Sequence, residues 1–480
     1  MRISGIVHKI KFLVLFSMLY GCHTYNKAPQ YPSIKLPEGL SVDSSKTSID
    51  KMQWRTFFTD TILISLIDEA LKNNPDMLMA TQRIELARSF LMQSRGSYLP
   101  YISADISAST NKLGEYTADG VGNFDSNLSS NVPDDKKIPS PLTDYFMGLR
   151  SSWEIDIWGK LRNLRRAAYA RFVASEKGKH WVTTSLVAHV ASLYYTLLAY
   201  DQELMIIQKN VELQKEILET IKNLKEAGKA NELAIKQSTA QYMHTQFMEI
   251  LIKQNIQKTE NELNNLLGRY PQPIQRIDYD AQNPIAENFL KSIPPSLLLN
   301  RPDVQQAEWE LKASEKELKA ARAAFLPSLA ISAHTGYNAF VIDPLLSPAS
   351  FVYGALAGMS APLLQGRRIK ANHKAALARN YEAYYAYQKT ILNAYKEVQT
   401  NLQKIEAYNK AMKLKEVEVQ ILTEGVVASD YLFKAGYASY LEVIFAQKNV
   451  LEAELQLVDT RKEKYLALVD LYYSLGGGWQ

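Results

Sequence analysis

The sequence lacks the motifs on which most enzymes and nucleotide-binding proteins depend. It contains neither G-x-x-x-x-G-K-[ST] nor G-x-G-x-x-G, the glycine-rich patterns that cradle phosphate. Its seven histidines are scattered and include no H-E-x-x-H pair, so a histidine-based metal site is not expected. No nucleophile–base or paired-carboxylate arrangement stands out either. We therefore expect that the protein is not an enzyme and holds no metal or nucleotide.

A strong charge of one sign is also missing. The formal net charge is +5, and three basic residues before position 22 account for part of it: Arg2, Lys9 and Lys11. No acidic residue precedes Cys22, so the rest of the chain carries a net charge of +2. This balance gives no electrostatic case for a nucleic-acid partner.

The apolar run at residues 12–19 is too short to span a membrane, but it follows a basic segment, as in a signal peptide. It ends in Leu19-Tyr20-Gly21-Cys22, which resembles the lipobox of bacterial lipoproteins, and Cys22 is the only cysteine. The resemblance implies a signal peptide over 1–21 and a covalent lipid on Cys22, with no other cofactor. His23 stands where lipoproteins kept at the inner membrane commonly have Asp, so the outer membrane is favoured. An ordinary signal peptide is the alternative, because Tyr20 is bulky for a lipobox.

What the sequence does contain is a duplication. Gly228 and Gly436 each interrupt a long helical pattern, and each predicts the tip of a helical hairpin. Two prolines with the same spacing also bound a helical stretch in each half: Pro75 with Pro100, and Pro302 with Pro327. We expect two copies of one unit, residues 59–283 and 284–478. A lipidated, extended leader over residues 22–58 precedes them.

Each copy carries two segments that alternate apolar and polar residues, as half-exposed strands do. The predicted strands cover about residues 101–112, 145–157, 328–338 and 351–364. Loops are expected at 113–144 and 338–350. Strands of roughly ten residues with one apolar face are typical of a transmembrane β-barrel, and four strands are too few to close one. The chain must therefore oligomerise, with a dimer supplying 8 strands and a trimer 12.

Long helical stretches follow the strands, at about residues 160–227 and 367–435. At about 1.5 Å per residue, each reaches on the order of 100 Å. The return helix of the second copy carries a coiled-coil heptad, interrupted by Lys448 and Lys462. Its members recur every seven residues: Ile444, Leu451, Val458, Tyr465 and Tyr472. The first copy is less regular, and Met243, Phe247 and Ile250 are its best part.

An ordered set of motifs resembles the TolC-like outer membrane factor family, in its lipoprotein (NodT-type) branch. The set comprises Trp153-Glu154-Ile155-Asp156-Ile157-Trp158-Gly159-Lys160-Leu161-Arg162, Asn300-Arg301-Pro302-Asp303, Ala320-Ala321-Arg322-Ala323-Ala324-Phe325-Leu326-Pro327, Gly436 to Val443 followed by Ala446-Gln447, and Leu475-Gly476-Gly477-Gly478-Trp479. The resemblance covers nearly all of residues 22–479. It implies an α+β membrane protein, a homotrimer with a 12-stranded barrel in the outer membrane of a Gram-negative bacterium. Its long helical hairpins are then expected to form a periplasmic α-barrel. The resemblance further implies partners, namely a periplasmic adaptor protein and an inner-membrane pump that supplies the energy.

The resemblance also places functional residues at the hairpin tips. The positions carried over as tip and adaptor contact are Gly228, Lys229, Ala230, Gly436, Tyr437, Ala438, Ser439 and Leu441. Asp430 is the first gate candidate, because three copies about a three-fold axis form a carboxylate ring that favours cations. Glu424 is a second acidic candidate, and Tyr431 or Phe433 could supply an apolar plug instead. The alternatives are that the tip residues only cap and pack helices, and that Asp430 is a solvated acid outside the tube.

The leading hypothesis is a passive exit duct of a tripartite efflux system. An outer-membrane component of type I polypeptide secretion is the nearest alternative. A pore-less periplasmic coiled-coil scaffold is a different class, and two hairpins with four barrel-type strands argue against it. The sequence does not choose the cargo among drugs, metal cations, lipids and polypeptides.

Overall fold

The computed structural model describes residues 29, 31–32, 54–277, 295–365 and 367–477. The predicted signal peptide, Cys22, most of the leader and residues 278–294, which include the predicted boundary between the copies, lie outside these residues. The described chain forms two compact units. The sheet unit comprises residues 87–172 and 311–383 with Tyr31, and the helical unit comprises 54–86, 173–310 and 384–477 with Pro32.

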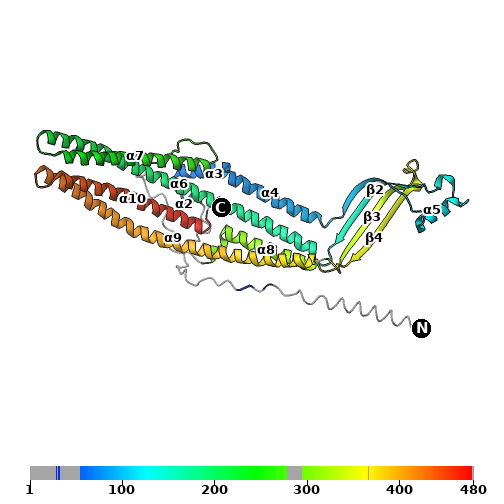
Figure 1. Cartoon of the computed structure of the whole chain (residues 1–480). Coiled ribbons are helices and arrows are strands. Elements are labelled where there is room, and N and C mark those ends of the chain that lie inside the picture. Colours follow the sequence, from blue (N-terminus) through cyan, green and yellow to red (C-terminus); the bar gives the residue numbers. More distant parts are fainter. Residues whose placement is uncertain (1–28, 30, 33–53, 278–294, 366, 478–480) are drawn as a thin grey trace. The chain divides into compact units, whose positions relative to one another are not determined.

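The sheet unit is built on one antiparallel sheet in the order β1-β2-β3-β4 (Figure 1). Its strands are β1 (Tyr101–Asn111), β2 (Leu142–Ile155), β3 (Ser328–Ala339) and β4 (Phe351–Ser360). The four-stranded prediction is therefore confirmed. β4 stops four residues short of the predicted end because Pro362 follows closely and has no N–H for the ladder.

The register places apolar side chains on one face of all four strands. Ile106 pairs with Met147, Met147 with Tyr337, and Tyr337 with Phe351. Paired residues of an antiparallel sheet point to the same side. Exposed members of this face are Ile102, Ile106, Met147, Leu149, Trp153, Phe351, Tyr353 and Met359. The face is continuous across the sheet, as the alternation in the sequence predicted.

The opposite face is polar and carries small residues. Ser103 pairs with Arg150, and Arg150 pairs with His334. Tyr101, Phe146 and Leu356 are large apolar or aromatic residues on this face, and Phe146 is only 5% exposed, with the Arg150 guanidinium 4.6 Å from its ring centroid. A Cβ added at Gly148 would approach the Thr335 carbonyl oxygen to 2.3 Å, so a side chain does not fit there.

Two helical hairpins of equal dimensions make up most of the remaining chain. α6 (Lys160–Glu226) and α9 (Arg368–Lys434) have 67 residues each, and α7 (Glu232–Leu266) and α10 (Tyr440–Ser474) have 35 each. The other helices are α2 (Trp54–Phe57), α3 (Thr61–Asn73), α4 (Pro75–Gly96), α5 (Ala118–Leu128) and α8 (Pro302–Ala323). Short 3-10 turns are η2 (Asp134–Lys136), η4 (Pro295–Asn300) and η5 (Pro348–Ser350).

One of the two expected loops contains a helix. α5 lies within residues 113–144, where Asp, Gly, Asn and Ser suggested irregular structure. Thr117 caps it, because its side-chain oxygen accepts from the Gly120 N–H at 3.1 Å. This local cap outweighs the weak helix propensity of the segment.

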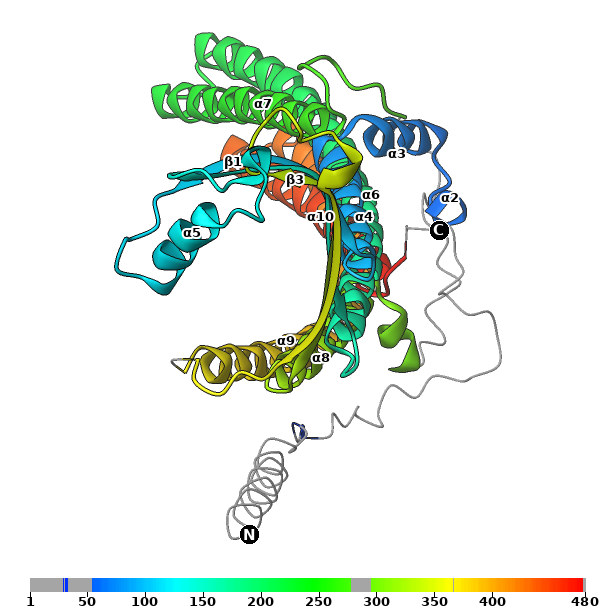
Figure 2. The same cartoon turned by 90° about the vertical axis from the view of Figure 1, so that its right-hand side faces the viewer.

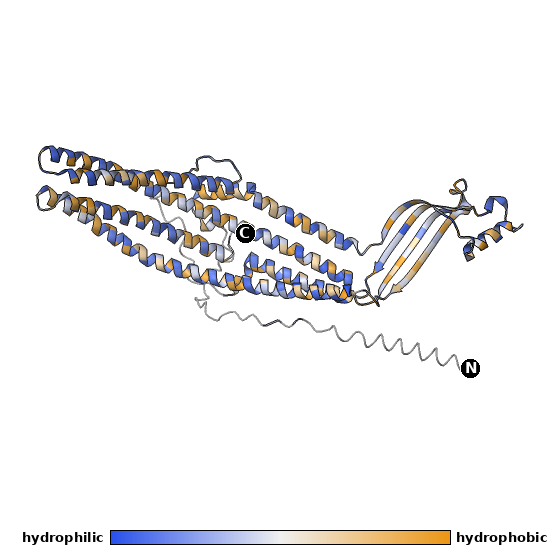
Figure 3. Ribbon diagram, in the orientation of Figure 1, coloured by the Kyte–Doolittle hydropathy of each residue, from blue (hydrophilic) through white to orange (hydrophobic). Residues whose placement is uncertain are grey.

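The main core lies in the helical unit, where α6 packs against α3, α9 and α10. Tyr194 and Tyr195 are 0% and 1% exposed at its centre, and the Tyr194 hydroxyl donates to Asp60 at 2.5 Å. Among the described helices, α6 holds a stretch apolar enough to cross a membrane, but 61% of it is buried inside the structure. Packing in this core therefore accounts for that stretch. Figure 3 shows apolar and polar residues mixed along the helices, as expected for helices with one buried face.

Candidate functional site: the hairpin tips and the adjoining groove

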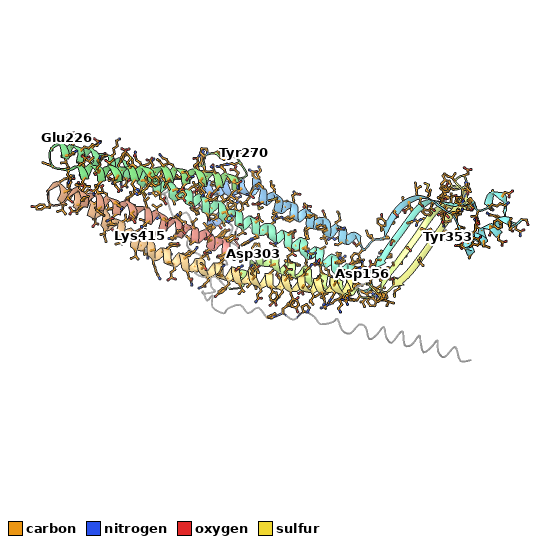
Figure 4. The ribbon with its side chains drawn as sticks, viewed as in Figure 1. Asp156, Glu226, Tyr270, Asp303, Tyr353 and Lys415 are labelled. Atoms are coloured by element: carbon orange, nitrogen blue, oxygen red, sulfur yellow. The ribbon has the colours of Figure 1, made fainter. Side chains whose placement is uncertain are left out.

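The first tip closes α6 with a glycine in the left-handed region. Gly228 has φ of 70°, and the Lys229 N–H donates to the Leu224 carbonyl at 2.8 Å. The Gly228 N–H donates to the Lys225 carbonyl at 2.9 Å. This pair of bonds is the Schellman ending that glycine favours. Figure 4 shows Glu226, the last residue of α6, at this tip.

The second tip, at the end of α9, repeats this geometry. Gly436 has φ of 78°, the Tyr437 N–H donates to the Leu432 carbonyl at 2.9 Å, and the Gly436 N–H donates to the Phe433 carbonyl at 3.0 Å. A Cβ added at either glycine would meet nothing within 4 Å. Glycine is therefore favoured at both tips by backbone conformation and not by crowding.

Each return helix then begins with its own cap. The Asn231 side chain accepts from the Ala234 N–H at 2.9 Å, and the Glu442 carboxylate accepts from the Ser439 N–H at 2.5 Å. Lys225 also forms an ion pair with Glu232 across the first tip. These bonds fix the turn that each tip presents.

The structure brings the two tips together. Ile221, Ala234 and Ile444 form one buried cluster that joins α6, α7 and α10. The Tyr440 hydroxyl donates to the Gln237 side chain at 2.7 Å. The two halves of the chain therefore present their tips side by side.

The adaptor-contact candidates differ in how much surface they offer. Tyr437 is 85% exposed and is the most prominent of them. The other exposed candidates are Gly228, Lys229, Gly436 and Ser439, and the half-buried ones are Ala230, Ala438 and Leu441. Ala230 packs against the cluster that joins the tips.

The four gate candidates differ in their exposure and in their hydrogen-bond partners. Asp430 forms an ion pair with Lys434 at 2.6 Å, and this hydrogen bond raises the pKa of Lys434. Glu424 accepts from the Gln420 side chain at 3.1 Å and is exposed. Tyr431 is 69% exposed, whereas Phe433 is half-buried. Each Asp430 therefore brings a paired cation with it.

A groove between α7 and α10 was not predicted, and its lining on these helices begins twelve to thirteen positions beyond the tip glycines. Its volume is about 430 Å³, and its lining is Glu203, Gln241, His244, Met248, Lys448, Leu451, Glu452, Leu455, Gln456 and Asp459. The signal was present in the sequence as the two lysines that interrupt the heptad. Lys448 lines the groove, and the charge of Lys462 acts on Glu203.

Glu203 is the most perturbed acid of this groove. Burial raises its pKa to about 7, Lys462 opposes the shift, and Asp459 adds to it. Across the part of the chain that the structure describes, no group of three or more His, Cys, Asp or Glu side chains could hold a metal ion.

Comparison with known proteins decides the family. The outer membrane efflux protein family matches residues 66–269 and 293–477. The chain belongs to that family. It is similar to the probable outer membrane lipoprotein SilC of Salmonella typhimurium, with 26% identity over 483 residues that cover 98% of this chain and 99% of SilC.

Other relatives include proteins of efflux systems. The toluene efflux pump outer membrane protein TtgI of Pseudomonas putida is 28% identical over 488 residues, covering 98% of this chain and 99% of TtgI. Crystal structures of CusC match with a TM-score of 0.80 at 25% identity, covering 94% of this chain and 99% of that one. CusC is a cation efflux system protein in Escherichia coli. The chain is thus an outer-membrane efflux protein and not an enzyme, which confirms the predicted family, fold, location and class of function.

Proposed function

We propose that the protein is the exit duct of a tripartite efflux system and works as a homotrimer. The observation that carries this proposal is the four-stranded sheet with one continuous apolar face and two unpaired edges, β1 and β4. An open edge cannot face lipid, because its backbone N–H and C=O groups find no partner there. Three copies give 12 strands and pair every edge, with β4 of one copy beside β1 of the next.

The helical hairpins extend the pore into the periplasm. At about 1.5 Å per residue, the 67 residues of α6 or α9 reach on the order of 100 Å. Twelve helices from three copies then surround a passage whose energy comes from an inner-membrane pump. The duct itself conducts passively.

A periplasmic adaptor binds at the tips and in the groove between α7 and α10. A helix of the adaptor would lay its apolar side against the half-buried Met248 and Leu455 and meet charged residues at the rim, such as Glu452 and Asp459. The glycine-ended tips would contact the adaptor through Tyr437 and Lys229. Cross-linking from Glu452→Cys to a co-purified adaptor tests this contact, with the exposed Glu212→Cys as the matched control.

The gate lies at the tips, and Asp430 with Lys434 is its polar component. Phe433 and Tyr431 are the apolar candidates, and Glu424 is a further acid one to two turns away. Lipid on Cys22 holds the assembled trimer to the outer membrane.

The cargo is a small solute and not a polypeptide. The similar proteins support this choice, because they are named for efflux of cations and toluene and for export of pyoverdine. They do not favour type I secretion.

Native mass spectrometry of the detergent-solubilised protein tests the proposal. Three copies per particle are expected, and a stable monomer or dimer would contradict the duct. Mass spectrometry of the mature N-terminus gives a separate answer for Cys22, since the Cys22→Ser variant should lose the lipid mass.

A further inference from the structure

We propose that α7 of one copy packs against α9 of the next copy in an antiparallel seam, in a single register fixed by matching apolar residues. This inference rests on the proposed trimer and adds the surface and the register that join its copies. It concerns the tip half of the hairpins, within the helical unit.

Two unpartnered apolar stripes carry the inference. On α7, Met243, Phe247 and Ile250 are 58%, 53% and 67% exposed. On α9, Leu414, Val417 and Ile421 are 73%, 54% and 61% exposed. Residues spaced three and four apart lie on one face of a helix, so each set forms a continuous stripe. Exposed apolar residues arranged in this way indicate a contact surface.

The two stripes stand at the same distances from their tips. Met243, Phe247 and Ile250 follow Gly228 by fifteen, nineteen and twenty-two positions. Ile421, Val417 and Leu414 precede Gly436 by the same three counts. At about 1.5 Å per residue, both stripes therefore cover roughly 22 to 33 Å from the tips. The three spacings agree in both order and size.

Contacts within each hairpin show that the number of residues from the tip glycine measures the distance from the tip along the hairpin. Gln208 precedes Gly228 by twenty positions, and it donates at 3.2 Å to Glu249, which follows that glycine by twenty-one. Lys415 precedes Gly436 by twenty-one positions, and it donates at 2.6 Å to Gln456, which follows that glycine by twenty. Residues at nearly equal counts from a glycine therefore lie side by side.

The two tips also lie at the same position along the hairpin axis. Ile221, Ala234 and Ile444 stand seven, six and eight positions from their respective glycines and share one buried cluster. The rotation that relates the three copies is about an axis along the tunnel, so it leaves the distance of each residue from the tips unchanged. Met243 of one copy then faces Ile421 of the next, Phe247 faces Val417, and Ile250 faces Leu414.

The occupant of these stripes is a second copy because the stripes lie on opposite sides of α10. Figure 1 shows α7 on one side of α10 and α9 on the other. α10 touches both, since it lines the groove with α7 and Gln456 bonds to Lys415 of α9. Figure 2, viewed along the helices, shows the same order of α7, α10 and α9. Within one chain α10 therefore separates α7 from α9, and a neighbouring copy brings an α9 stripe to the free α7 stripe.

The same relation extends to the tip. Leu233 follows Gly228 by five positions and Tyr431 precedes Gly436 by five, and they are 57% and 69% exposed. Tyr431 is therefore a residue of the seam between copies. Phe433 is then the aromatic gate candidate that lies outside the seam.

Cysteine cross-linking of the full-length protein in detergent tests the register. The natural chain has only Cys22, so the Phe247→Cys/Val417→Cys variant adds one defined pair. A short bis-maleimide is expected to convert it to covalent trimers on a denaturing gel. The Met243→Cys/Leu414→Cys variant uses residues of the same stripes set seven positions out of register. Its trimer yield is expected to be about tenfold lower, because an offset of about 10 Å exceeds the approach that cross-linked cysteines need.

Native mass spectrometry of the same samples separates this inference from the proposed function. Trimers without cross-links, cross-links equal in the two variants, or cross-links confined to single chains would overturn the seam and leave the duct standing. A monomer by native mass would overturn both. Single-cysteine variants show whether Cys22 contributes to any cross-linked band.

Discussion

Arg301 donates a hydrogen bond to the backbone carbonyl of Ser474, far along the chain at the end of α10, at 2.7 Å. Asn74 makes the corresponding bond in the first half, from its side-chain amide to the Leu266 carbonyl at 2.9 Å. Both donors directly precede the proline that begins a helix, and both acceptors end a long return helix two residues before a glycine with positive φ. In both halves, therefore, a side chain just before the helix-starting proline donates a hydrogen bond to the last residue of the return helix.

Replacing Arg301 should destabilise the helical unit severely. Its side chain is 1% exposed, pairs with Asp303 at 2.8 Å and Glu397 at 2.9 Å, and lies over the Trp181 ring. The Arg301→Ala variant leaves these acids without their cation, a change that costs about 3–5 kcal/mol at buried pairs. Thermal unfolding in detergent measures the loss. Arg55→Ala, which removes an exposed pair with Asp68, should change stability by less than about 1 kcal/mol. Equal losses in the two variants would contradict this account.

Two glycines of the second hairpin should respond in opposite directions to alanine. Gly436→Ala places a Cβ on a residue with φ of 78°, which costs about 1–2 kcal/mol. Gly425 lies inside α9 with nothing within 4 Å of an added Cβ, so Gly425→Ala should gain up to about 1 kcal/mol. Both variants add the same methyl group. Thermal stabilities shifted in the same direction would show that the tip turn is not held by its backbone.

Glu203 should make stability depend on pH. Its pKa is raised to about 7 in the folded protein by burial, against an ordinary value near 4.5. The folded state therefore favours its protonated form, and that contribution is fully present below pH 4.5 and is lost as the pH rises through 7. Glu203→Gln should be more stable than the natural protein at pH 8, by on the order of 1 kcal/mol. Melting temperatures from pH 4.5 to 8 measure this effect. A stability difference that stays constant across that range would refute it, and Glu212→Gln is the exposed control.

Charge removal at the tip should change ion selectivity in two directions. Lys434 pairs with Asp430, so Lys434→Gln unmasks three carboxylates per trimer and should raise cation selectivity. Asp430→Asn leaves three lysines and should lower it. Reversal potentials in a salt gradient measure both variants. If neither variant moves the reversal potential, the gate does not include Asp430.

The sequence carried the local features of this fold and missed those that depend on packing. The strands follow from alternation and the tips from glycine, because each signal lies within a few residues. The Asp430–Lys434 pair was also readable, since residues four apart meet on a helix. The groove was missed because it needs α6, α7 and α10 in place together. The burial of Arg301 was missed for the same reason, since its partners Glu397 and Ser474 come from distant parts of the chain.

The most direct test of the duct is single-channel conductance of the purified, lipidated protein in planar bilayers. A small, cation-selective conductance is expected from the natural protein, and its cation selectivity should fall in Asp430→Ala, which leaves three Lys434 side chains without their acid. If the variant conducts ions like the natural protein, Asp430 is not part of the gate, and Phe433 is the next candidate. A folded trimer that conducts no ions in any variant would contradict the duct itself.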